Sequence, residues 1–191
     1  MALALLAACR GGNDKVLPTA TVPTAPETTT TTALYAVPPV IDAAYVNRVV
    51  TGLDAIAGDT TRLIVRTRTI PREAFDRVKA IYHNDSEVDR VLKGYSDQLA
   101  SGLPGAQQNP GDKKSVVKEM LSASPQCMFA RVERDYSAIS ANAFSGITEW
   151  VALRPLDPGR DPSHYNATGW AYVYEGFTSQ RTQPERNPCS T

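Results

Sequence analysis

Apolar residues recur at three- and four-residue spacing between residues 41 and 99, which is the pattern of amphipathic helices that bury one side. In the first stretch the apolar stripe runs through Ile41, Tyr45, Val49 and Leu53. The pattern predicts three successive helices. Their apolar stripes cover residues 41–57, 75–82 and 88–99.

Start signals accompany two of these stripes. Asp42 suits the positive N-terminal end of the first helix. Ser86 with Asp89 resembles a capping box that opens the third helix. Gly52 and Gly58 weaken the first stripe, so a kink or an early end of that helix stays open.

The apolar period changes from helical to strand-like in the second half of the chain. Residues 127–136 form the clearest strand, in which Met128, Ala130 and Val132 alternate with Phe129 and its polar successors. The apolar run before it, at residues 115–123, fits either a strand or a short helix, and we favour a strand. The other predicted strands are 115–123, 148–154 and 169–177.

An aromatic row marks the last predicted strand. Trp170, Tyr172 and Tyr174 are two residues apart, so they are expected on one side of it, with Trp150 on the neighbouring strand beside them. An exposed row would be a binding surface for glycan, peptide or an apolar ligand. A row covered by the helices would be core, and this is the interpretation that we favour.

Helices followed by consecutive strands with short links predict an α+β fold. We expect one domain over residues 40–191, with the N-terminal helices packed on one face of an antiparallel β-sheet of about four strands. A disordered spacer rich in threonine and proline precedes it at residues 10–39, because that segment has no apolar periodicity and cannot bury enough surface to fold.

Charge and hydropathy exclude several classes of partner. The chain has 20 basic and 20 acidic residues among 191, so no net charge attracts nucleic acid. No apolar run approaches the length that a membrane-spanning helix needs. We therefore expect no nucleic-acid partner and no transmembrane helix.

The first nine residues end in a motif that resembles the lipobox of bacterial lipoproteins. Leu6, Ala7 and Ala8 precede Cys9, directly after an apolar segment. The resemblance implies that Cys9 is diacylated and becomes the mature N-terminus, which would attach the protein to a membrane. No Lys or Arg precedes Cys9, so we expect that the true start lies upstream of Met1. An accidental apolar N-terminus on a cytosolic protein is the alternative.

Two cysteines remain once Cys9 is assigned to lipid. Cys127 and Cys189 lie in the predicted folded part, in no metal-ligand spacing and beside no histidine. An exported protein with one disulfide would have this count, and the bridge would stabilise the fold by roughly 4 kcal/mol. Two unrelated free thiols are the alternative.

Two resemblances extend over residues 40–189. The order of helices and strands is similar to the nuclear transport factor-like, or ketosteroid isomerase-like, cone. The Ser-Pro-Gln-Cys sequence at residues 124–127 and the Pro-Cys pair at residues 188–189 resemble those of a family of exported actinobacterial lipoproteins. The fold hosts enzymes and non-enzymes, so it implies no particular activity.

Catalytic motifs are missing from the sequence, including phosphate-binding loops, dinucleotide-binding glycine patterns and zinc-protease motifs. His83 and His164 are the only histidines, and both fall at expected helix ends or loops. Asp135 and Tyr136 supply the residue types of a ketosteroid isomerase-like site, but neighbours on a strand point to opposite faces. We predict no catalytic residue, no cofactor and no metal site.

These observations favour a lipid-anchored binding or interaction module on the outer face of the bacterial cytoplasmic membrane or in the cell envelope, without enzymatic activity. Its expected partner is an envelope protein, a glycan or an apolar small molecule. A small envelope enzyme of the ketosteroid isomerase-like class is the first alternative. A structural or regulatory domain of an envelope assembly is the second.

Overall fold

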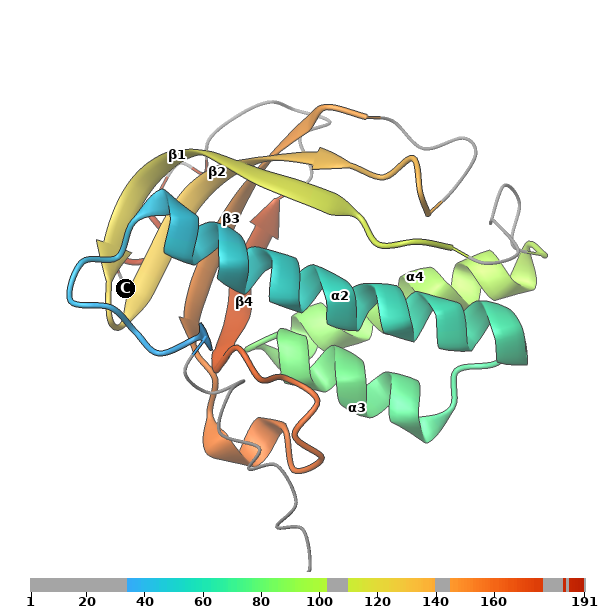
Figure 1. The fold of residues 1–191 in the computed structure, drawn as a ribbon. Helices are drawn as coiled ribbons and strands as arrows, with labels where there is room; N and C mark the ends of the chain where they lie inside the picture. Colours follow the sequence, from blue (N-terminus) through green and yellow to red (C-terminus); the bar gives the residue numbers. More distant parts are fainter. Residues whose placement is uncertain (1–33, 103–109, 140–144, 177–183, 185, 191) are drawn as a thin grey trace, which may run out of the picture.

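The computed structural model describes residues 34–102, 110–139, 145–176, 184 and 186–190. These residues form helices packed against an open antiparallel sheet, so the predicted α+β fold is confirmed (Figure 1). The helices are α2 (Ala43–Thr67), α3 (Arg72–Ile81) and α4 (Asp85–Ala100), with a 3-10 turn η1 (Pro158–Arg160). The strands are β1 (Lys114–Ser124), β2 (Cys127–Asp135), β3 (Ile147–Pro155) and β4 (Trp170–Gly176).

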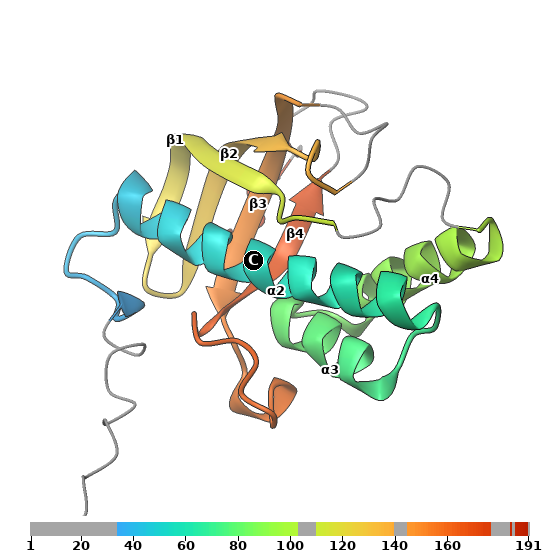
Figure 2. The same ribbon diagram turned by 45° about the vertical axis from the view of Figure 1, so that its right-hand side comes forward.

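The four strands lie in the order in which they follow along the chain, each antiparallel to the next. Met128 of β2 pairs with Leu153 of β3, and Ala130 pairs with Val151. These four side chains are fully buried and face the helices. Helix α2 crosses this face of the sheet, and α3 and α4 lie beside the C-terminal half of α2 (Figures 1 and 2).

Helix α2 runs for 25 residues without interruption, so the early end that the two glycines left open does not occur. Asp42, which the sequence placed near the start of this helix, is its N-cap and accepts a hydrogen bond of 2.7 Å from the Tyr45 amide. Both glycines mark close approaches: a Cβ on Gly52 would lie 2.6 Å from Thr168, and one on Gly58 only 1.9 Å from Asp112. Glycine is therefore needed at both positions because a neighbouring residue packs closely there, and not because the backbone must be flexible.

The start of α4 differs from its prediction. The helix begins at Asp85, one residue before the expected capping box, and Asn84 occupies the N-cap position without a side-chain bond to the helix. Asp85 and Glu87 lie in the first turn, where they complement the positive end of the helix. Charge near the terminus thus replaces the capping box.

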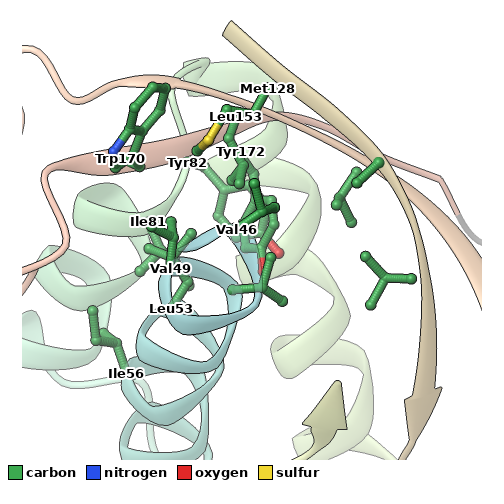
Figure 3. Packing of buried hydrophobic residues seen from close by; sticks show 14 of the residues in the cluster. Val46, Val49, Leu53, Ile56, Ile81, Tyr82, Met128, Leu153, Trp170 and Tyr172 are labelled. Atoms are coloured by element: carbon green, nitrogen blue, oxygen red, sulfur yellow. The ribbon is translucent and has the colours of Figure 1, made fainter. Parts of the chain in front are cut away.

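The core joins the apolar stripes of the helices to the inner face of the sheet. Figure 3 shows Val46, Val49 and Leu53 of α2 in one cluster with Tyr172 and Trp170 of β4. All five side chains are at most 2% exposed. Burial of such residues stabilises the fold by roughly 1.5–3 kcal/mol each.

The aromatic row is split between the two faces of the sheet. Trp170 and Tyr172 are core residues, as the favoured interpretation expected. Tyr174 pairs with Ala152 after a register shift in β4, which moves it to the opposite face. Trp150 also lies on that face, with its ring 6.5 Å from the ring of Phe129. The prediction that Tyr174 shares a side with Trp170 and Tyr172 is therefore wrong, whereas Trp150 does lie on the neighbouring strand.

The C-terminal segment is fastened to the face of the sheet that points away from the helices. Cys127 and Cys189 form a disulfide across 62 residues of sequence, so the predicted pairing is confirmed. Arg154 of β3 adds a hydrogen bond of 3.3 Å from its guanidinium to the Pro188 carbonyl. The face of the sheet that packs against the helices is lined by other side chains.

Candidate ligand-binding cavity

A cavity of about 450 Å³ lies between the helices and the end of the sheet where β2 ends, β3 begins and β4 ends. Its volume is within the usual range for small-molecule sites. The lining residues come from α2, α3, α4 and the sheet. They are Ala57, Gly58, Thr60, Thr61, Val78, Ile81, Tyr82, Arg90, Val91, Gly94, Tyr95, Gln98, Lys113, Tyr136, Ile139, Ile147 and Glu175.

Most of the cavity wall is apolar. Val78, Ile81 and Val91 contribute aliphatic side chains from α3 and α4. The hydroxyls that approach the cavity already have partners: Thr60 donates to the Ile56 carbonyl at 2.8 Å, and Thr61 shares a 2.9 Å hydrogen bond with Tyr95. The wall therefore suits an apolar molecule.

The base of the cavity is polar and almost closed off from solvent. Lys113 directly precedes β1, and its side chain is 9% exposed, whereas that of Glu175 in β4 is 5% exposed. The Lys113 Nζ atom lies 3.1 Å from Glu175 Oε1 and 3.1 Å from Asp54 Oδ1. Tyr82 donates a 2.5 Å hydrogen bond to the other oxygen of Glu175. An ion pair thus lies at the base of an otherwise apolar cavity.

Arg134 extends this ion pair into the interior. Its guanidinium is completely buried, donates to Glu175, and lies 3.1 Å from Glu149 Oε2 and 3.8 Å from Asp54 Oδ1. Asp54, Lys113, Arg134, Glu149 and Glu175 form what we call the buried charge cluster. Two cations face three carboxylates, so the cluster carries one excess negative charge when every member is ionised.

Strand register explains how two members of the cluster reach the interior. Arg134 follows Met128, Ala130 and Val132 at two-residue spacing, so it takes an inward position on β2. Glu149 pairs with Val132 and takes the equivalent position on β3. A charged residue at an apolar position of an alternating strand was the available sequence signal, and the sequence analysis missed it.

The remaining members have less visible origins. Asp54 follows Val50 by one helical turn and lies on the buried face of α2. Glu175 pairs with Val151 and faces inward because of the register shift in β4. Lys113 lies outside any predicted element. Their meeting depends on tertiary structure.

The titratable groups at the base of the cavity have pKa values that are shifted away from neutral pH. Burial and the charge of Glu175 raise the pKa of Tyr82 well above its ordinary value. Burial opposes the charged form of Glu175, but Lys113 and Arg134 outweigh it and lower the pKa of that carboxyl. Burial likewise opposes the charged form of Lys113, yet the carboxylates of Asp54 and Glu175 raise its pKa. Such groups are poor proton donors and acceptors near neutrality.

Glu149 differs because burial raises its pKa above the ordinary value of 4.5. Its ionised form is penalised in the folded protein, so the penalty grows as pH rises through the folded-state pKa. Glu175 has the opposite sign: its contribution is present above 4.5 and is lost as pH falls towards its lowered pKa.

The two carboxyls should therefore respond oppositely to the same substitution. At pH 7 we expect Glu175→Gln to lower the free energy of unfolding by about 3–5 kcal/mol, because Lys113 and Arg134 both lose the charged carboxylate that they share. Glu149→Gln should leave it unchanged or raise it by about 1 kcal/mol, because the cluster becomes neutral. Urea unfolding between pH 4 and pH 8 measures both. Equal losses for the two variants, or a Glu149→Gln effect that is independent of pH, would contradict the assignment.

The residues considered for catalysis in the sequence analysis lie elsewhere, with one exception. His164 is exposed, and Asp135 is a half-buried residue that accepts a hydrogen bond from the Ser137 amide. His83 follows α3, and its amide donates to the Tyr172 carbonyl at 2.8 Å. Tyr136 lines the cavity and donates a 2.5 Å hydrogen bond to Glu149.

The predicted ligand surface is not brought together. Trp170 and Tyr172 are buried beneath the helices, and only the Tyr172 hydroxyl reaches the charge cluster, where it accepts a 3.0 Å hydrogen bond from Arg134. Trp150 and Tyr174 are half-buried on the other face of the sheet. Cys9 lies outside the described residues.

Comparison with known proteins adds no relative: no protein-family model, curated protein or solved structure matches this chain.

Proposed function

We propose that the protein is a lipid-anchored binding module of a bacterial cell envelope, without enzymatic activity, and that its cavity takes an apolar small molecule. The cavity between helices and sheet carries this proposal, because its wall is apolar and its polar groups are concentrated at one end. Small-molecule sites in proteins commonly combine these properties. The buried ion pairs at the base fix their side chains in place, so the pocket is formed before a ligand arrives.

The envelope location rests on the N-terminal sequence and on the disulfide. The lipobox-like Cys9, the proline- and threonine-rich spacer and the Cys127–Cys189 bridge all suit an exported lipoprotein. Within the described part of the chain, no helix is long and apolar enough to cross a membrane. Mass spectrometry of the protein from the membrane fraction of its bacterial host tests the anchor, and an unmodified Cys9 there would contradict it.

Filling the cavity should weaken ligand binding. Gly94 of α4 lines the cavity, and a Cβ at this position would contact nothing within 4 Å. We expect wild-type protein to bind the uncharged fluorescent probe N-phenyl-1-naphthylamine saturably, and Gly94→Phe to weaken binding at least tenfold. The helix should tolerate the change, because phenylalanine has a higher helix propensity than glycine. Fluorescence titration measures the affinity.

Ser96→Phe is the matched control, since it places the same ring at an exposed position two residues along α4 that does not line the cavity. It should bind the probe as the wild type does. Equal binding by Gly94→Phe and wild type would show that the probe occupies another site and would remove the support for the cavity.

The ketosteroid isomerase-like alternative retains one observation in its favour. It requires a pocket between helices and sheet with a buried carboxylate, and Glu175 occupies such a place. Against it, Lys113 and Arg134 lower the pKa of Glu175, whereas a general base works best with a pKa near the operating pH. Carboxyl NMR of Glu175 across pH distinguishes the two: titration near neutrality would favour the enzyme, and an ionised carboxylate down to acidic pH favours the binding module.

A further inference from the structure

The polar groups at the base of the cavity already satisfy one another's charge. The Glu175 carboxylate accepts hydrogen bonds from Tyr82, Lys113 and Arg134. The Lys113 ammonium contacts two carboxylates, each at 3.1 Å. Arg90, the other cation of the lining, pairs with Glu87 at 2.7 Å. An incoming charged group would therefore find no unpaired charge of the opposite sign among the described lining residues.

A charged ligand would therefore lose hydration without compensation. An anion beside Lys113 would also lie next to the carboxylate of Glu175, and a cation beside that carboxylate would lie next to the ammonium. Attraction and repulsion would nearly cancel, whereas the cost of removing a charge from water would remain. The base of the cavity thus disfavours ligand charge of either sign.

Among the described residues, one N–H of the Lys113 ammonium has no acceptor. An ammonium group has three N–H donors, and those of Lys113 that have partners go to Asp54 and Glu175. Its other neighbours are the rings of Tyr136 and Tyr172, whose centroids lie 5.9 Å from Nζ. Among the described residues no further acceptor contacts this nitrogen, so a ligand oxygen can accept the third N–H.

We propose, on the basis of the proposed function, that the cavity selects uncharged apolar molecules that present one acceptor oxygen, such as a carbonyl, to Lys113. The apolar wall binds the body of the ligand, and the ammonium binds the oxygen. The buried charge cluster rejects carboxylates, sulfonates and ammonium groups of otherwise similar shape.

Four naphthalene derivatives of nearly equal size test this selection by displacement of N-phenyl-1-naphthylamine from wild-type protein. We expect 2-acetonaphthone, an uncharged ketone, to bind most tightly. Loss of the acceptor in 2-ethylnaphthalene should weaken binding about ten- to hundredfold, the range for one hydrogen bond to a charged group. The anion 2-naphthoate and the cation 2-naphthylmethylammonium should bind at least tenfold more weakly than the ketone.

A double variant, Lys113→Met/Glu175→Gln, checks the role of the base while removing one charge of each sign. It should bind the ketone and 2-ethylnaphthalene within twofold of each other. If this variant fails to fold, the four-ligand series on wild-type protein still decides the question.

The outcomes separate the two proposals. Tighter binding of either charged analogue, or equal binding of ketone and hydrocarbon by the wild type, would overturn the selection and leave a ligand-binding cavity. Absence of saturable binding of N-phenyl-1-naphthylamine and all four compounds would overturn the proposed function and the selection together.

Discussion

Replacing Arg134 by methionine is expected to lower the free energy of unfolding by about 3–5 kcal/mol, because it leaves buried carboxylates without their cation. The guanidinium is completely buried and lies against both Glu149 and Glu175. Methionine has a similar length, so lost volume contributes little. Urea denaturation at pH 7 with the disulfide intact measures the change.

Arg131→Met provides the comparison on the same strand. Arg131 pairs with Glu119 at 3.1 Å on the surface, where the two side chains are 36% and 50% exposed. Such a pair contributes about 0–1 kcal/mol. If Arg134→Met were as mild as Arg131→Met, the buried charge cluster would be hydrated, and the argument that it rejects charged ligands would fail.

Removing the disulfide is expected to cost about 4 kcal/mol, from the chain entropy that a 62-residue separation constrains in the unfolded state. The double variant Cys127→Ala/Cys189→Ala tests this by urea unfolding in non-reducing buffer. Cys9→Ala is the control and should leave stability unchanged, because Cys9 is outside the bridge. A loss below about 1 kcal/mol in the double variant would mean that the bridge adds little to the fold.

Probe binding should survive removal of the disulfide wherever the protein remains folded. The bridge fastens residues 186–190 to the face of the sheet opposite the helices, whereas the cavity lies on the helical face. The bridge therefore supports the scaffold, and the charge cluster shapes the site.

Local patterns in the sequence were sufficient for the architecture. Alternation through Met128, Ala130 and Val132 identified β2, and Asp42 marked the start of α2. These features depend on residues close in the chain, so propensity and periodicity report them. The α2 glycines misled because their role lies in contacts with distant residues, such as Gly58 with Asp112.

The cavity depends on contacts that no local pattern contains. Arg134 and Glu175 are 41 residues apart and meet only because β2, β3 and β4 pair in register. The shift within β4 turns Glu175 inward and Tyr174 outward, which reverses what strict alternation predicts. A charged residue at the inward position of Arg134 could have pointed to a buried ion pair, but its partners could not be identified from spacing.

Tyrosine ring NMR during titration with N-phenyl-1-naphthylamine tests most directly whether the cavity is the binding site. Tyr82, Tyr95 and Tyr136 line the cavity, whereas Tyr165 and Tyr174 do not. We expect the ring signals of the first three to shift saturably with the affinity found by fluorescence, and those of the other two to stay in place. Saturable shifts at Tyr174 with unchanged signals from the cavity tyrosines would contradict the account.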